Sequence, residues 1–290
     1  MTALAVFAVL AAIFLRAVWW GSDVVFDPPK MLPNEVWPEE FGLAHEPVGF
    51  LSADGLRLKG WLIPAAETTD RTVVVCHGWG DNKGDVLSHV HALARKFNLF
   101  LFDSRHHGES DGHRSTIGCL ESRDVTAALA FLRERRLEWT RRMGIFGISM
   151  GSAVAIWAAA RDEGLRCVAV ESPFPSFEGV VARWSWNAFR LPFFPFPWAT
   201  VALMRWRLGE DPEPYSPRYR VAAIAPRPML FIAGELDELM PVAEVREVFE
   251  AAGHPKELWI VPKAAHGKCE ETAPEAYRQR LSAFFERNLT

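Results

Sequence analysis

The sequence has few cysteines and no excess of basic charge. Its four cysteines, Cys76, Cys119, Cys167 and Cys269, are scattered without C-x-x-C pairs or zinc-finger spacing, so neither a disulfide framework nor a structural zinc site is predicted. Thirty-two basic residues against thirty-six acidic ones leave a net charge of −4. Nucleic acid and other polyanionic partners are therefore not expected. The chain also contains no internal repeat.

An apolar segment opens the chain. Residues Thr2–Trp20 are apolar except for Thr2 and Arg16. As a helix they span about 28 Å, close to the hydrocarbon thickness of a bilayer. No basic residue precedes the run and no clear small-x-small site follows it, which argues against a cleaved signal peptide. Residues 1–21 are predicted to form a membrane anchor of undetermined sidedness, and a helix packed on a cytoplasmic enzyme is the alternative.

The remaining residues have the composition and patterning of one α/β domain. At 290 residues and 49% hydrophobic composition the chain can bury a large core. A proline-broken linker is expected at 22–46, followed by the domain at 47–290. The β-branched run Thr72–Cys76 is typical of a strand buried on both faces. Alternating strands and helices then indicate a mainly parallel sheet with helices on both faces.

The expected elements begin with a hairpin, continue as alternating helices and strands, and end with a helix. The strands are Val48–Phe50, Leu56–Ile63, Thr72–Cys76, Leu99–Phe102, Met143–Ile148, Cys167–Val170, Pro228–Ala233 and Glu257–Val261, and the helices are Leu87–Lys96, Leu120–Arg135, Ser152–Ala160, Ala243–Ala251 and Pro274–Arg287.

One insertion interrupts the alternation, at about 172–226. It is crowded with phenylalanine, tryptophan and proline, and the prolines should divide it into short helices joined by turns. Because it follows a central strand, it is predicted to lie over the carboxyl end of the sheet as a cap. Its aromatic underside is expected to form an apolar acyl pocket, with Phe174 and Trp184 as substrate-binding residues. In the alternative, these aromatics only attach the cap to the body or to a membrane.

The motif Gly147-Ile148-Ser149-Met150-Gly151 follows an apolar run and precedes an alanine-rich segment. This order is typical of a strand, a very tight turn and a helix. Ser149 at the turn would have a strained backbone with its hydroxyl pushed outward, and the two glycines leave room for the neighbouring chain. The pattern predicts Ser149 as a nucleophile.

A serine nucleophile needs a base and a carboxylate that orients the base. Asp237 follows the strand Pro228–Ala233, and His266 follows the last strand, so both are expected at the edge of the sheet where Ser149 lies. Glu235 and Glu238 are neighbouring carboxylates that could substitute for Asp237. The predicted catalytic residues are Ser149, Asp237 and His266.

Acyl transfer also needs donors for the oxyanion. His77-Gly78-Trp79-Gly80 follows the buried strand ending at Cys76, and its glycines let backbone N–H groups approach a reacting carbonyl. The amides of Trp79 and Met150 are the predicted oxyanion hole, against a plain glycine turn as the alternative. Gly78 and the Trp79 side chain are further expected to contact substrate.

Two other polar segments are interpreted as structural. The run Asp103–Ser110, with His113, contains possible metal ligands, but contiguous loop residues seldom converge on a metal without ligands from elsewhere. The basic run at 133–142 lies near the end of a predicted helix, where the helix dipole favours positive charge. Neither a metal site nor a cofactor site is predicted.

Five motifs in order carry a resemblance to a known family. They are His77–Gly80, Phe102–Ser110, Gly147–Gly151, Gly234–Asp237 and His266–Gly267. Together they resemble the α/β-hydrolase superfamily, closest to its esterase, lipase and serine-aminopeptidase-like branch, some members of which are tethered by an amino-terminal helix. The resemblance implies a serine hydrolase that needs no cofactor. Ser104–Gly108 departs from the usual aromatic-Arg-Gly-His-Gly run, with His107 in the position of the family histidine.

These observations predict a membrane-associated serine hydrolase of carboxylic esters with hydrophobic acyl groups. A small-molecule or lipid-like acyl ester is the expected substrate. A thioesterase or protein deacylase, an acyltransferase and a peptidase of the same fold are the alternatives, and a non-catalytic binding module on this scaffold comes after them. A haloperoxidase-like activity is a further alternative, whereas a dehalogenase would need a carboxylate where Ser149 stands. The sequence does not specify an oligomeric state.

Overall fold

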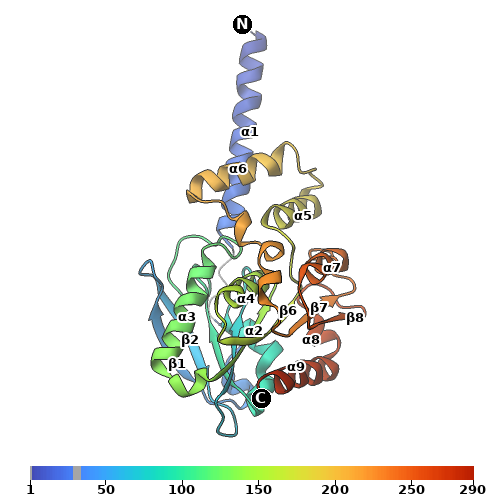
Figure 1. Ribbon diagram of the computed structural model, residues 1–290. Coiled ribbons are helices and arrows are strands. Elements are labelled where there is room, and N and C mark those ends of the chain that lie inside the picture. Colours follow the sequence, from blue (N-terminus) through green and yellow to red (C-terminus); the bar gives the residue numbers. More distant parts are fainter. Residues whose placement is uncertain (1, 29–33) are drawn as a thin grey trace.

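The computed structural model describes residues 2–28 and 34–290, and its centre is a mixed β-sheet with helices on both faces (Figure 1). The sheet has eight strands in the order β1-β2-β4-β3-β5-β6-β7-β8. The strands are β1 Glu46–Leu51, β2 Arg57–Ile63, β3 Arg71–Cys76, β4 Asn98–Phe102, β5 Arg142–Ile148, β6 Leu165–Glu171, β7 Met229–Gly234 and β8 Lys256–Val261. The β1–β2 and β2–β4 pairs are antiparallel, and the pairs from β4 to β8 are parallel.

The alternation of side chains along the strands explains the two layers of helices. In β3, Val74 faces a cluster that includes helix α3 (Glu121–Arg135), whereas Val73 and Val75 face a cluster that includes α2 (Lys83–Val90). Helices α4 (Met150–Arg161) and α7 (Val242–Ala251) contribute to the first cluster, and α9 (Pro274–Asn288) contributes to the second. A short helix, α8 (Cys269–Thr272), precedes α9. The predicted fold class is confirmed.

The helix expected at Leu87–Lys96 differs most from its prediction. It begins at Lys83, because the side chain of Asn82 accepts hydrogen bonds from the amides of Gly84 (2.7 Å) and Asp85 (3.2 Å) and so caps the helix there. The helix ends at Val90, and His91–Arg95 continues as a 3₁₀ turn. The other predicted strands and helices occur within a few residues of their expected bounds.

The aromatic insertion between β6 and β7 forms two helices, α5 (Phe177–Phe189) and α6 (Phe196–Leu208), followed by short 3₁₀ turns at Glu213–Tyr215, Pro217–Tyr219 and Val221–Ile224. Ser176 caps α5, and Arg190 ends it in a left-handed conformation with φ of 55°. Figure 1 shows α5 and α6 on one side of the sheet, beyond the end of β6. The insertion is called the cap below.

Helix α1 (Thr2–Phe26) runs past the expected end of the apolar segment at residue 21. Residues 22–26 were expected in the linker, but no proline occurs before Pro28, and Arg207 of α6 holds this turn through Ser22 (2.7 Å) and Asp23 (2.6 Å). Residues 29–33 of the expected linker lie outside the described residues. A 3₁₀ turn at Pro38–Phe41 precedes β1. Figure 1 shows α1 crossing α6 and projecting away from the sheet.

Candidate active site

Ser149 lies in the tight turn between β5 and α4 that the sequence predicts. Its backbone has φ of 53° and ψ of −118°, a strained conformation for a residue with a side chain, and its amide donates to the carbonyl of Glu171 at 2.9 Å. A Cβ at Gly147 would lie 2.1 Å from the Gly151 oxygen, and one at Gly151 would lie 2.2 Å from the Cys76 oxygen. Both positions therefore require glycine, and the turn exposes the serine hydroxyl above the sheet.

Three side chains that are distant in sequence meet at this edge of the sheet. The Nε2 atom of His266 lies 3.1 Å from Ser149 Oγ, and Nδ1 of the same ring lies 2.8 Å from Asp237 Oδ2. Asp237 follows β7 and His266 follows β8, and the parallel order of β5, β6, β7 and β8 brings the ends of these strands together. With Nδ1–H donating to the carboxylate, Nε2 is free to accept the serine proton.

The structure also shows which carboxylate orients the histidine. Asp237 is buried and accepts hydrogen bonds from the amides of Leu239 (3.0 Å) and Met240 (2.7 Å) and from Ser172 Oγ (2.8 Å). Glu235, one of the considered substitutes, instead accepts from the amide of Lys263 at 2.9 Å. Ser172 was not found by sequence reasoning, because a serine after a strand carries no signal of its own.

The electrostatic surroundings of His266 favour its protonated form. Burial alone would lower the pKa of the imidazole, but the hydrogen bond to Asp237 and the negative charges of Asp237, Glu171 and Asp81 raise the pKa above its ordinary value. An imidazolium is the species that forms when this ring takes a proton from serine. The site is therefore arranged to stabilise that charge.

The loop that follows β3 approaches the nucleophile closely. A Cβ at Gly78 would lie 3.6 Å from Ser149 Cβ and only 2.3 Å from Asp81 Oδ2, so glycine allows the approach. Met150 is the first residue of α4, where amide groups have no partner inside the helix. Trp79 and Met150 both line the cavity beside Ser149.

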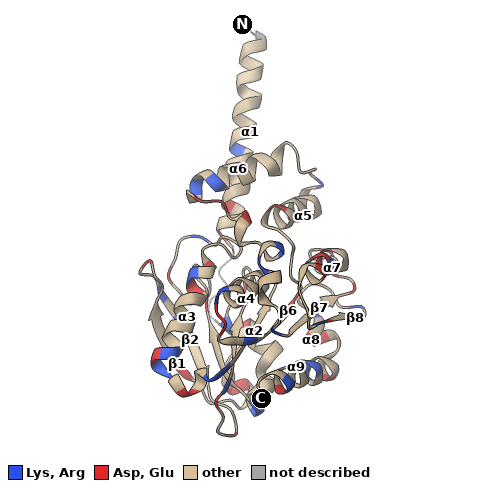
Figure 2. Ribbon diagram, in the orientation of Figure 1, with Lys and Arg blue, Asp and Glu red and all other residues tan. Residues whose placement is uncertain are grey.

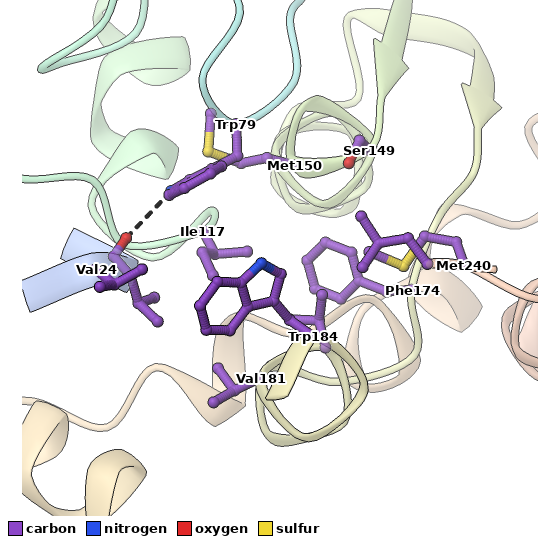
Figure 3. Close-up of a pocket in the computed structure, with 12 residues that line it drawn as sticks. Val24, Trp79, Ile117, Ser149, Met150, Phe174, Val181, Trp184 and Met240 are labelled. Atoms are coloured by element: carbon purple, nitrogen blue, oxygen red, sulfur yellow. Dashed lines mark hydrogen bonds between the residues drawn. The ribbon is translucent and has the colours of Figure 1, made fainter. Parts of the chain in front are cut away.

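An apolar cavity of about 510 Å³ opens beside Ser149 (Figure 3). Figure 3 shows Trp79 and Met150 on the Ser149 side and Val181 and Trp184 of α5 opposite. Of the four predicted substrate-binding residues, Trp79, Phe174 and Trp184 line the cavity, whereas Gly78 lies next to Ser149 without lining it. The full lining is Val24, Val25, Trp79, Ile117, Ser149, Met150, Phe174, Val180, Val181, Trp184, Leu239 and Met240.

The end of α1 forms part of this cavity wall, which the sequence did not indicate. Val24 and Val25 line the cavity, and the carbonyl of Val25 accepts a hydrogen bond from Trp79 Nε1 at 3.1 Å, drawn as the dashed line in Figure 3. No local pattern distinguishes these two valines from the apolar residues before them. Their role depends on α1 packing against the cap.

Comparisons with known proteins support the fold and the family. A family model described as serine aminopeptidase, S33, matches residues 67–210. The Mycobacterium tuberculosis protein Rv2307c is 30% identical over 221 residues, which cover 75% of this chain and 70% of that protein. Protein YfhR of Escherichia coli is 28% identical over 250 residues, covering 82% and 80%. The esterase Pf2001 of Pyrococcus furiosus superposes with a TM-score of 0.76 at 25% identity, covering 92% of this chain and 99% of that one.

The chain belongs to the α/β-hydrolase superfamily. The family model and the esterase neighbour support a hydrolase with esterase-like activity. The resemblance noted in the sequence is thereby confirmed.

A second pocket of about 1150 Å³ also includes Ser149 in its wall. Asp81, Asp85, His89 and Lys268 line it together with His266. Burial and the charge of Asp85 raise the pKa of Asp81 to about 6. Ser149 thus borders both an apolar cavity and a pocket that contains charged residues.

The loop Asp103–Ser110 has a structural role in this hydrolase. Asp103 is fully buried and accepts hydrogen bonds from Lys83 Nζ (2.7 Å) and from the amides of Lys83 (2.8 Å) and Glu109 (2.9 Å). Arg105 donates to Asp124 at 2.7 Å and to Asp54 at 2.8 Å. These contacts fix the loop after β4 against the loop after β3, which contains Gly78 and Trp79.

Proposed function

We propose that this protein is a serine hydrolase of carboxylic esters with hydrophobic acyl groups. The observation that carries the proposal is the chain of hydrogen bonds from Asp237 through His266 to Ser149, which ends at the mouth of an apolar cavity. The esterase neighbour supports the choice of ester over other acyl compounds.

In the proposed reaction, Ser149 Oγ attacks the acyl carbon while His266 Nε2 takes the serine proton. The amides of Trp79 and Met150 donate to the carbonyl oxygen as it becomes an oxyanion. When the tetrahedral intermediate collapses, the bond to the alcohol oxygen breaks and His266 returns the proton to that oxygen. The result is an acyl-enzyme on Ser149 and a free alcohol.

Water then completes the cycle. His266 takes a proton from the water, whose oxygen attacks the acyl carbon, and the same amides hold the second oxyanion. Collapse releases the acid and returns the proton to Ser149 Oγ. Asp237 keeps its charge throughout, since it holds the imidazole in position and stabilises the imidazolium.

The two cavities suit the two parts of an ester. The cavity beside Ser149 is lined by apolar side chains, and burial of each CH₂ of an acyl chain there contributes about 0.8 kcal/mol. The pocket with charged residues is lined by His266, which must reach the alcohol oxygen and the attacking water. The acyl chain is therefore assigned to the apolar cavity, and the leaving group to the pocket that contains His266.

We also propose that α1 anchors the enzyme in a membrane. Among the described residues, α1 is the helix that is long and apolar enough to cross a bilayer, judged by length and composition. Its first part is almost entirely exposed, unlike a core helix of a soluble protein.

A fluorophosphonate probe tests the nucleophile. The full chain should be labelled, and Ser149→Ala should abolish labelling, whereas Ser152→Ala, the next serine of the same segment, should be labelled like the wild type. Turnover of p-nitrophenyl esters should fall in Ser149→Ala and His266→Ala by up to about a million-fold, the effect known for such residues in a serine protease. Persistent labelling of Ser149→Ala would refute the assignment.

A substrate panel tests the bond that is cleaved. With equal acyl groups, we expect p-nitrophenyl esters to react faster than acyl thioesters and aminoacyl amides. A higher kcat/KM for the thioester or for the amide would replace the ester assignment by the corresponding activity.

A further inference from the structure

Large aromatic side chains are exposed where α1 meets the cap. Trp20 of α1 packs edge-on against Phe189 of α5, with ring centroids 5.6 Å apart, and both are more than two-fifths exposed. Phe194 and Trp198, at the start of α6, lie 5.7 Å apart and are 68% and 52% exposed. These four residues are called the cap face below. Exposed aromatic clusters of this kind mark a surface that binds an apolar partner.

Few charged residues flank the cap face. Residues 179–209 contain four arginines, and three of them form ion pairs: Arg183 with Glu244, Arg205 with Glu178, and Arg207 with Asp23. The projecting part of α1 carries only Arg16. In Figure 2 the projecting part of α1 and the neighbouring part of the cap are mostly uncharged, whereas both signs are spread over the helices around the sheet. A surface of exposed aromatic side chains with few charges is typical of the interfacial layer of a bilayer.

The burial pattern of α1 indicates the level at which a bilayer would end on the protein. Its residues are exposed from Ala3 to Arg16, apart from the half-buried Ala11, and burial begins at Val18 and is complete at Gly21 and Ser22. A bilayer crossed by α1 therefore ends at the level of Trp19 and Trp20, which is also the level of the cap face.

Two apolar cavities lie between the cap face and Ser149. A second cavity of about 300 Å³ lies between α1, α5 and α6, and Trp20 and Phe189 of the cap face are in its wall. This second cavity shares Val25, Val181 and Trp184 with the cavity beside Ser149. The two cavities therefore share a wall of apolar side chains, which lies between Ser149 and the surface from which α1 projects.

We propose that the cap face lies in the interface of the bilayer and that the substrate is an acyl ester lipid whose chain enters from the bilayer through a passage between α1, α5 and α6. This inference rests on the proposed esterase function and adds its substrate class and its route of entry. The end of α1 is then part of the acyl-binding site as well as of the anchor.

Hydrolysis from vesicles tests the route. The full chain is reconstituted into vesicles of phosphatidylcholine and phosphatidylglycerol that carry a fluorogenic long-chain acylglycerol, and water-soluble p-nitrophenyl butyrate is assayed in parallel. Phe194→Asp and Trp198→Asp place a carboxylate in the cap face, and Leu137→Asp, at an exposed position before β5, is the matched control. Aspartate at 198 also suits the first turn of α6, so the helix is retained.

We expect both cap-face variants to lose at least about tenfold in the vesicle reaction, because a carboxylate is costly in the membrane interface, and to keep wild-type rates on the soluble ester. Leu137→Asp should change neither rate. The inference is overturned if the wild type cleaves the soluble ester but not the vesicle lipid, or if the cap-face variants lose both activities equally or lose neither. An enzyme inert to both esters and to the fluorophosphonate would instead refute the esterase function.

A second measurement tests whether the cap face lies in the bilayer and does not depend on enzyme activity. All four native cysteines are buried and free, so Trp198→Cys offers a selective site for a fluorescent label, with Leu137→Cys as control. Nitroxide lipids in the vesicle should quench the label at position 198 strongly and the label at position 137 weakly. Equal quenching at the two positions would show that the cap face does not lie in the bilayer.

Discussion

At the scale of single residues, the site is a set of acidic groups arranged around one imidazole. Asp237 contacts His266 directly, whereas Glu171 and Asp81 act through their charge. Glu171 is fully buried at the end of β6 and accepts a hydrogen bond from Tyr277 at 2.6 Å, so it is fixed in position. The pKa of His266 therefore depends on two further carboxylates besides its hydrogen-bond partner.

We predict that Asp81→Asn shifts the pH profile of the enzyme. His266 must be neutral to accept the serine proton, so kcat/KM rises with pH through the pKa of His266, which lies above its ordinary value of about 6.5. Asp81 has a pKa of about 6 and is ionised in that range, where its charge raises the pKa of His266. Removing the charge should move the acidic limb of kcat/KM to lower pH.

The measurement is kcat/KM for p-nitrophenyl butyrate against pH. Glu257→Gln, an exposed acidic residue on β8 paired with Arg287, is the control and should leave the limb in place. A limb that stays or moves to higher pH in Asp81→Asn would contradict the prediction.

At the scale of elements, α1 and α5 define the acyl-binding cavity. Val181 of α5 is 4% exposed and lines both apolar cavities, so it belongs to the wall that they share. Trp79, from the loop after β3, is held to the end of α1 by its hydrogen bond to Val25. A change in either helix should therefore alter acyl-chain preference before it alters the chemistry.

Val181→Trp is predicted to shorten the accepted acyl chain. The indole would occupy part of both cavities, so the terminal CH₂ groups of a long chain would lose their burial, at about 0.8 kcal/mol each. We expect the ratio of kcat/KM for a decanoate ester to that for an acetate ester to fall at least about tenfold. Val181→Ile, which adds one methyl group, should change the ratio little. An unchanged ratio in a tryptophan variant that still reacts with the fluorophosphonate would contradict this role.

At the scale of the whole molecule, buried ion pairs join the loops that hold the site. Lys83 is buried at the start of α2 and pairs with Asp103 after β4 at 2.7 Å and with Glu109 at 2.6 Å. The ammonium group also lies 4.7 Å from the centroid of the Trp61 ring. The loop after β3 is thereby fixed to the loop after β4.

Lys83→Met should destabilise the fold strongly. Asp103 would remain buried with its cationic partner removed, and breaking a buried pair in this way costs about 3–5 kcal/mol. The free energy of unfolding, from chemical denaturation in detergent, is the measurement. Lys268→Met breaks an exposed pair with Glu271 and should cost less than about 1 kcal/mol. Equal effects of the two substitutions would show that the buried pair contributes no more than a surface one.

Much of this protein is predictable from local sequence. The β-branched run of β3 and the alternation of strands and helices predict the sheet, and Gly147 and Gly151 predict the strained turn at Ser149. Asp237 and His266 are recognisable because each follows a strand in the required order. These features depend on neighbours along the chain, since backbone strain, helix capping and side-chain alternation are set within a few residues.

Only the tertiary structure decided which residues line the cavity beside Ser149 and which charged residues lie near His266. Val25 meets Trp184, Ser172 meets Asp237, and Asp81 lies beside His266 only because segments far apart in the chain are packed together. The same packing extends α1 past residue 21 and brings it into the acyl cavity. The sequence by itself determined the sheet and the placement of Ser149, Asp237 and His266 after their strands, whereas the cavity depends on non-local contacts whose partners no local pattern specifies.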